Sequence, residues 1–248
     1  MISAIVLAAG SGKRMNSQTA KQYLKIYDKE VLYYSLKVFE ACEKINQIIL
    51  VTKEDDIEYC KKEIVEKYKF NKIMNIIPGG RERYDSVHAG LSLLNSLDRT
   101  AGIDGNTEDD IVLIHDGARP FVTNDMILES IETVKKYGAC SVGVPVKDTI
   151  KIVDENGFSV ETPDRKYLYQ IQTPQTFKLD LILSAYKKFE KDDNHNITDD
   201  TMLVEQYTGV KSKIIFGAYE NIKITTPDDM ELAEKIVEKS FKKIKKSC

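Results

Sequence analysis

The stretch that decides the fold runs from Ala4 to Met15 and reads AIVLAAGSGKRM. Its first four residues are apolar and have the length and composition of a buried β-strand. Small residues and two cations, Lys13 and Arg14, follow at once. In open α/β sheets, ligands bind beyond the carboxyl ends of the strands, and consecutive N–H groups of a glycine loop can cradle phosphate oxygens. We therefore predict a phosphate-binding loop on an α/β fold.

The pattern that begins at this strand continues along the chain. Short runs rich in Ile and Val alternate with amphipathic stretches, as expected when both faces of a sheet are covered. Further strands are predicted at 48–52, 73–77, 111–114, 141–144 and 213–216. Apolar residues recur between them at helical spacing, and Thr226-Pro227 is typical of a helix start. The sequence predicts one domain, residues 1–248, with a Rossmann-like, mostly parallel sheet and helices on both faces.

Two stretches interrupt the alternation. Residues 97–110 hold two glycines and several acids and amides, which favours a solvated loop. Within 147–170, Asn156-Gly157 separates two short β-like runs and is a strong hairpin signal. We predict that residues 147–170 form a β-hairpin arm that projects from the sheet rather than a second domain.

Composition and charge argue against several function classes. The 36 basic and 39 acidic residues give a net charge of −3, without global attraction to nucleic acid or anionic membrane. No apolar run approaches the roughly 20 residues of a membrane-spanning helix, and the N-terminus lacks the basic region of a signal peptide. The four cysteines form no C-x-x-C pair and are expected to be reduced core residues. We expect a cytoplasmic protein with no nucleic-acid or membrane partner.

The glycine loop matches neither common phosphate fingerprint. A dinucleotide G-x-G-x-x-G would need glycine where Met15 stands, and the Walker pattern is absent. On the loop alone, a basic surface turn remains an alternative.

The motifs resemble those of the sugar-phosphate nucleotidyltransferases, most closely the 2-C-methyl-D-erythritol 4-phosphate cytidylyltransferases of non-mevalonate isoprenoid biosynthesis. The resemblance rests first on AAGSGKRM at 8–15 and KQYL at 21–24. It departs at Ala20, where the family usually has proline. Further matching segments lie at 79–87, 115–121, 144–151, 162–165, 172–177, 198–200 and 221–227.

This resemblance implies cytidylyl transfer from CTP to 2-C-methyl-D-erythritol 4-phosphate, with Mg²⁺ as cofactor and release of pyrophosphate. It also implies a homodimer whose arm reaches the partner's active site. The implied catalytic residues are Arg14, Lys21 and Lys223. The implied CTP-binding residues are Ala8, Ala9, Gly10, Ser11, Gly12, Gly80, Ser86 and Asp116. The implied sugar-phosphate-binding residues are Thr149, Arg165 and Thr225.

Metal binding and structural roles are assigned to further polar residues. Asp116 follows the strand at 111–114, and a hard carboxylate there suits magnesium. Glu220 is a second candidate ligand. We expect His115 to be an orienting or core residue and Arg119 to pair with a nearby acid. Either acid at 199–200 is suited to a helix start.

Three alternatives remain at this point. A ribitol-5-phosphate cytidylyltransferase would share the fold and chemistry, but its loop more often reads AGG than the AAG at 8–10, and it lacks the VPVKDTIK run at 144–151. A non-catalytic nucleotide-binding regulator would not need the complete set of cations. A Rossmann oxidoreductase fits less well because the third glycine is missing.

Overall fold

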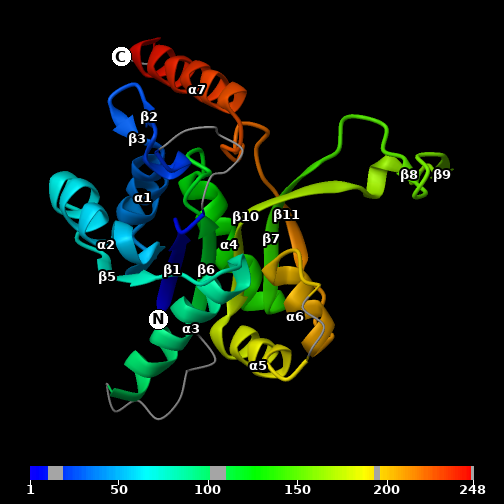
Figure 1. Ribbon diagram of the computed structural model, residues 1–248, viewed down its shortest axis with the longest axis horizontal. Helices are drawn as coiled ribbons and strands as arrows, with labels where there is room; N and C mark the ends of the chain where they lie inside the picture. Colours follow the sequence, from blue (N-terminus) through cyan, green and yellow to red (C-terminus); the bar gives the residue numbers. More distant parts are fainter. Residues whose placement is uncertain (11–18, 101–109, 193–195, 247–248) are drawn as a thin grey trace.

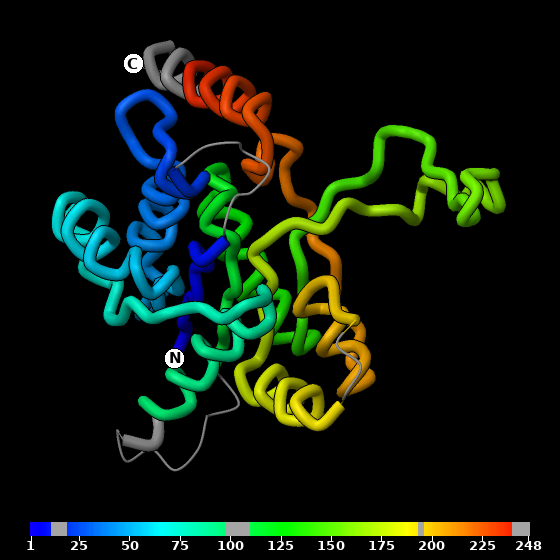
Figure 2. Tube along the Cα trace, in the orientation of Figure 1, coloured from blue at the N-terminus to red at the C-terminus, as the bar shows by residue number. Residues whose placement is uncertain are grey.

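The computed structural model describes residues 1–10, 19–100, 110–192 and 196–246 (Figures 1 and 2). A seven-stranded sheet lies at its centre, in the order β11-β7-β10-β6-β1-β4-β5. Its strands are β1 Ile2–Leu7, β4 Gln47–Thr52, β5 Ile73–Pro78, β6 Ile111–Asp116, β7 Ala139–Pro145, β10 Tyr169–Lys178 and β11 Lys213–Phe216. Neighbouring strands run parallel except β10, which is antiparallel to both β6 and β7. Every strand predicted from the sequence is present, and the α/β fold class is confirmed.

Helices cover both faces of this sheet (Figure 1). On one face pack α1 (Val31–Ala41), α4 (Asn124–Tyr137) and α2 (Ile57–Tyr59), which continues in π-helical form over Cys60–Glu66. On the other face pack α3 (Arg83–Thr100), α5 (Leu179–Phe189) and α6 (Asp200–Thr208). Within β1, Ala4 and Val6 join the first core and Ile5 joins the second. Both faces are therefore apolar, which explains why the strand sequences show no alternation.

The last helix, α7 (Pro227–Lys246), begins where Thr226-Pro227 predicted. Its Ala233 and Val237 pack in a separate small core with Ile26, which lies in the short strand β2 (Lys25–Ile26) paired with β3 (Lys29–Glu30). No helix in the described ranges is long and apolar enough to cross a membrane.

The predicted arm is a projecting hairpin (Figure 1). Strands β8 (Ile152–Val153) and β9 (Ser159–Glu161) pair antiparallel around a turn. Gly157 adopts a positive φ of 86° in that turn, a backbone conformation that favours glycine. The Asp154 carboxylate accepts hydrogen bonds from the amides of Asn156 and Phe158. The hairpin prediction from Asn156-Gly157 is confirmed.

Two details of the sequence interpretation were wrong. Residues 97–100 of the stretch expected to be a loop belong to α3, which continues to Thr100; residues 101–109 lie outside the described part. Strand β10 was not predicted, because Pro174 cannot donate a ladder hydrogen bond and normally excludes a central strand. The strand accommodates it where the pairing with β7 shifts register between Ile171 and Gln175.

The cysteine interpretation is confirmed for three of the four residues: Cys42, Cys60 and Cys140 are buried free thiols. Cys248 lies outside the described residues.

Candidate active site

A pocket of about 310 Å³ opens at the carboxyl ends of β1 and β6, beside the segment that follows β5. The topology explains this place, because parallel strands bring the loops that follow them to one edge of the sheet. Predicted site residues that line the pocket are Ala8, Ala9, Gly10, Lys21, Gly80, Ser86, Asp116 and Lys223. Ser11, Gly12 and Arg14 lie outside the described residues.

The loop after β1 and the start of α3 approach each other closely. A Cβ atom at Gly79 would lie 2.6 Å from Ser86 Oγ and 2.7 Å from the Ala9 side chain, so only glycine permits this contact. The Gly80 amide donates to Ser86 Oγ at 3.1 Å, and that hydroxyl donates to the Glu82 carbonyl at 3.3 Å. Ser86 thus holds the turn that forms one wall of the pocket.

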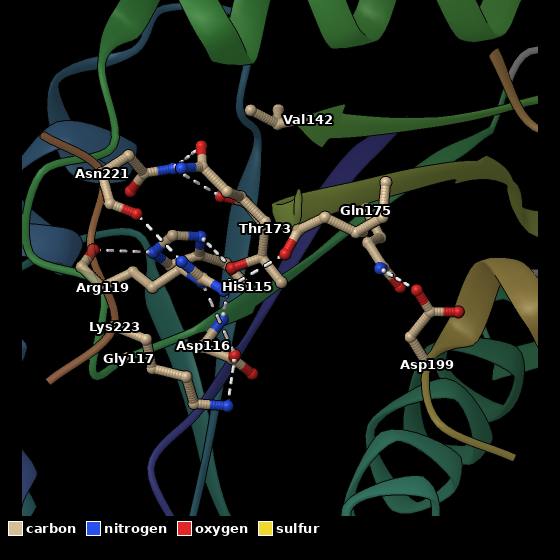
Figure 3. A network of polar contacts seen from close by, with 12 residues as sticks. His115, Asp116, Gly117, Arg119, Val142, Thr173, Gln175, Asp199, Asn221 and Lys223 are labelled. Atoms are coloured by element: carbon tan, nitrogen blue, oxygen red, sulfur yellow. Dashed lines mark hydrogen bonds and ion pairs between the residues drawn. The ribbon is translucent and has the colours of Figure 1, made fainter. Parts of the chain in front are cut away.

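Asp116, the last residue of β6, is the centre of charge in this pocket (Figure 3). One carboxylate oxygen, Oδ2, lies 2.8 Å from Lys223 Nζ and 3.8 Å from Arg119 Nε. The other, Oδ1, lies 3.3 Å from Arg83 Nε. Burial alone would raise the pKa of Asp116, but the charges of Arg83, Lys223 and Arg119 outweigh it and hold the pKa well below its usual range. The carboxylate is therefore ionised at neutral pH.

A hydrogen-bond network ties the residues around Asp116 to β10 (Figure 3). The Asp116 amide donates to Thr173 Oγ1 at 3.0 Å. Arg119 donates through Nη1 to the Asn221 carbonyl at 2.9 Å, and Asn221 Nδ2 donates to the Thr173 carbonyl at 3.1 Å. Together with its ion pair to Asp116, this makes Arg119 a partner of a nearby acid, as expected. The network fixes the segment that carries Lys223 against the end of β6.

Arg83 and Asp200 form an ion pair that the sequence did not predict. Arg83 Nη1 lies 2.7 Å from Asp200 Oδ2, so this guanidinium links two carboxylates. Asp200 is 1% exposed and also accepts from the Tyr186 hydroxyl at 3.2 Å. The helix-start role falls to its neighbour Asp199, which caps α6 through the Met202 amide. The local sequence has no signal for the ion pair between Arg83 and Asp200, because the two residues lie far apart in the chain.

The predicted sugar-phosphate residues do not line this pocket. Thr149 and Arg165 belong to the arm, and Arg165 Nη1 donates to the Lys147 carbonyl at 2.6 Å. The Thr225 hydroxyl donates to Asp229 Oδ2 at 2.8 Å at the start of α7. The chain's own fold therefore brings together those predicted CTP residues that the structure describes, but not the predicted sugar-phosphate residues.

Asp116 is the candidate protein ligand for a metal ion at this pocket. Among the described residues no group of three or more His, Cys, Asp or Glu side chains could bind a metal ion. Glu220 is exposed and does not line the pocket. Magnesium, however, is commonly held by one or two carboxylates together with substrate phosphates. The ionised Asp116 fits that role for a metal bound together with a nucleotide.

Comparison with known proteins decides the family. The profile of the 2-C-methyl-D-erythritol 4-phosphate cytidylyltransferases matches residues 2–239. The chain belongs to this family.

Individual relatives of this family resemble the chain over nearly its whole length. A 2-C-methyl-D-erythritol 4-phosphate cytidylyltransferase from Clostridium botulinum (strain ATCC 19397 / Type A) is 49% identical over 237 residues, 96% of this chain and 97% of the relative. One from Caldanaerobacter subterraneus subsp. tengcongensis is 46% identical over 238 residues, 96% and 99% of the two chains. The crystal structure of 4-diphosphocytidyl-2C-methyl-D-erythritol synthase from Anaerococcus prevotii DSM 20548 has a TM-score of 0.80 at 36% identity and covers 96% of each chain.

In this member of the cytidylyltransferase family, His115 is a buried orienting residue, as expected. Its Nε2 lies 3.1 Å from the Arg119 carbonyl, which can only accept, so we assign the proton to Nε2. Nδ1 then accepts from the Thr173 hydroxyl at 3.0 Å, and that hydroxyl in turn accepts from the Asp116 amide. Burial lowers the pKa of His115 to about 4. The neutral ring thus orients Thr173 and, through it, Asp116.

We predict that this histidine makes stability fall as the solution becomes acidic. An unfolded histidine takes up a proton near pH 6.5 and the folded one only near pH 4, so the unfolded chain binds more protons between these values. The free energy of unfolding should therefore fall by about 2 kcal/mol from pH 7 to pH 5 through this residue. Urea unfolding of the wild type and of His115→Gln measures it. An equally steep pH dependence in both proteins would contradict the assignment.

The Arg83–Asp200 pair yields a second prediction. Arg83→Met leaves a buried carboxylate without its cation and should lower the free energy of unfolding by about 3 kcal/mol. The double variant Arg83→Met, Asp200→Asn removes both charges and should recover part of this loss. Urea unfolding at pH 7 compares both with the single variant Asp200→Asn. Additive losses in the double variant would show that the two side chains do not stabilise each other.

Proposed function

We propose that the chain transfers a cytidylyl group from CTP to 2-C-methyl-D-erythritol 4-phosphate, giving 4-diphosphocytidyl-2-C-methyl-D-erythritol and pyrophosphate, in non-mevalonate isoprenoid precursor biosynthesis. One observation carries the proposal: residues 8–10 of the family's glycine loop, Lys21 and Lys223 converge with Asp116 on one pocket. Small residues at 8–10 leave room for a nucleotide, and the cations suit its phosphates.

The reaction is an in-line displacement at phosphorus. An oxygen of the sugar phosphate attacks the α-phosphorus of CTP, and the bond from that phosphorus to the oxygen bridging the β-phosphate breaks. The electron pair leaves with pyrophosphate. The nucleophile is already an anion, so no general base is required. Catalysis then comes from positioning and from stabilising the negative charge that gathers on the phosphate oxygens.

We assign charge stabilisation to Lys21 and Lys223, and to Arg14 outside the described residues. Lys223 is held 2.8 Å from Asp116, so its ammonium is fixed beside the pocket before a nucleotide binds. Asp116 is assigned the contact with the ribose of CTP. The glycine loop and the Gly80–Ser86 segment would enclose the nucleotide between them.

We propose Mg²⁺ as the cofactor, with Asp116 as its protein ligand. When bound, the ion would supply positive charge to the triphosphate oxygens. Asp116 is suited to it because this carboxylate stays ionised and borders the pocket.

We further propose a homodimer in which each arm reaches the partner's pocket. The arm exposes large apolar side chains, among them Phe158 at 72%, Val160 at 67% and Tyr167 at 76%. An apolar group of this kind on a projecting element is typical of an interaction surface. In an isologous dimer the two arms would be exchanged symmetrically, carrying Thr149 and Arg165 to the other subunit's nucleotide. The cytoplasmic location expected from the sequence stays a prediction.

The proposal is tested by pyrophosphate release from the purified protein with CTP and magnesium. We expect release with 2-C-methyl-D-erythritol 4-phosphate, none with ribitol 5-phosphate, and a stop when EDTA removes the metal. Preference for ribitol 5-phosphate would move the chain to the sibling activity. CTP binding without pyrophosphate release in the presence of either sugar-alcohol phosphate would favour a non-catalytic nucleotide-binding regulator.

Lys21→Ala should lower kcat by roughly 10³-fold because it removes one cation that neutralises the phosphates. Circular dichroism and thermal unfolding should show an intact fold. Turnover equal to the wild type would refute the catalytic role of Lys21. Lys25→Ala, at an exposed position of strand β2, serves as the matched lysine control.

The arm proposal predicts an effect on one substrate. Arg165→Ala should raise KM for the sugar phosphate by roughly 10-fold or more, because a charged hydrogen bond is lost, with little change in KM for CTP. Equal changes in both constants would argue against a substrate-binding arm.

Mixed dimers distinguish an arm that acts on the partner from one that acts on its own subunit. Lys21→Ala and Arg165→Ala chains are unfolded together, refolded and assayed at low sugar-phosphate concentration. If the arm acts across the dimer, each hybrid has one intact site and activity rises to about one quarter of the wild type. Activity no higher than that of the separate variants would exclude action across the dimer.

A further inference from the structure

The side chains of three consecutive residues of a 3₁₀ turn, Lys21–Tyr23, contact three different parts of the protein. Lys21 lines the pocket. Gln22 is 1% exposed, and its amide nitrogen Nε2 donates to the Ala8 carbonyl at 2.6 Å and to the Gly10 carbonyl at 3.4 Å. One buried side chain therefore ties the catalytic lysine's turn to the loop that follows β1.

These bonds decide which backbone groups of the loop remain for a ligand. The Ala8 amide donates to the Val51 carbonyl at 2.6 Å, and Gln22 satisfies the carbonyls of Ala8 and Gly10. Within the described part of the chain, the amides of Ala9 and Gly10 have no protein acceptor, and both residues line the pocket. Consecutive free N–H groups at a loop are suited to phosphate oxygens.

The opposite side of the turn is anchored in the core. The Tyr23 hydroxyl lies 2.7 Å from Thr52 Oγ1 and 3.2 Å from Cys60 Sγ. Its ring packs edge-on against Tyr59, with the centroids 4.9 Å apart. Because Tyr23 fixes the turn to the end of β4 and to α2, Gln22 has a firm base from which to hold the loop.

We infer that Gln22 is a positioning residue that sets the distance between the Ala9 and Gly10 amides and the Lys21 ammonium. This inference rests on the proposed function, because it assigns these groups to two sides of one triphosphate. Glutamine suits the place because its carboxamide provides two N–H donors for two carbonyls. Glutamate at 22 would present only acceptors when ionised, and methionine would fill the volume without donating.

The test compares Gln22→Met and Gln22→Glu with the wild type. Titration calorimetry measures CTP binding with magnesium and without the second substrate, and steady-state assays give kcat and both KM values. We expect Gln22→Met to weaken CTP binding and to lower kcat/KM for CTP by roughly 10- to 100-fold, since a small misplacement of binding groups has effects of this size. Gln22→Glu should show a larger loss of CTP affinity and of kcat/KM for CTP. KM for the sugar phosphate should not change.

Gln47→Met is the matched control, because the Gln47 amide donates to Ser3 Oγ at 3.1 Å at the far end of β1. It should leave the CTP dissociation constant and kcat unchanged.

A merely structural role is recognised by fitting stoichiometry and dissociation constant separately. Partial unfolding of Gln22→Met would reduce only the stoichiometry and kcat, and an unchanged CTP affinity in the folded fraction would overturn the inference. Failure of the proposed function is distinguishable, because the wild type itself would then release no pyrophosphate.

Discussion

The buried carboxylate of Asp116 is the constraint on which the site depends. A charge at this depth is costly unless cations surround it, and here they come from three separate segments: Arg83 at the start of α3, Arg119 after β6 and Lys223 before α7. Neutralising one carboxylate therefore brings these segments to the same place. The cations are then already gathered when an anionic nucleotide arrives, which is the preorganisation that charge-stabilising catalysis requires.

Strand β10, which runs antiparallel to its neighbours in the central sheet, connects this charge cluster to the arm. The hairpin lies within the connection from β7 to β10, so β10 starts at the base of the arm and then passes beside β6. Along that path the Thr173 hydroxyl accepts a hydrogen bond from the Asp116 amide and forms another with His115 Nδ1. The element that would carry substrate-binding residues to a partner is thus continuous with the strand that orients the central carboxylate.

The sequence predicted the parts of this arrangement that leave a local pattern. The apolar run at 111–114 located β6 and hence Asp116 at a carboxyl end, and the Asn156-Gly157 signal located the hairpin. Strand β10 was missed because proline is normally excluded from a central strand. In the structure, Pro174 lies where the pairing of β10 with β7 shifts register. The Arg83–Asp200 pair and the Gln22 contacts to 8–10 join residues by tertiary packing alone. A residue type that suits several roles, such as the acid at 200, does not reveal which of them the fold uses.

A crystal structure with CTP and magnesium tests the central claim most directly. The account predicts the triphosphate in the pocket between the loop at 8–10 and Lys223, with Asp116 beside the ribose or the metal. Lys21 should contact the phosphates. A nucleotide bound elsewhere, or one in this pocket whose phosphates avoid both lysines, would contradict the account.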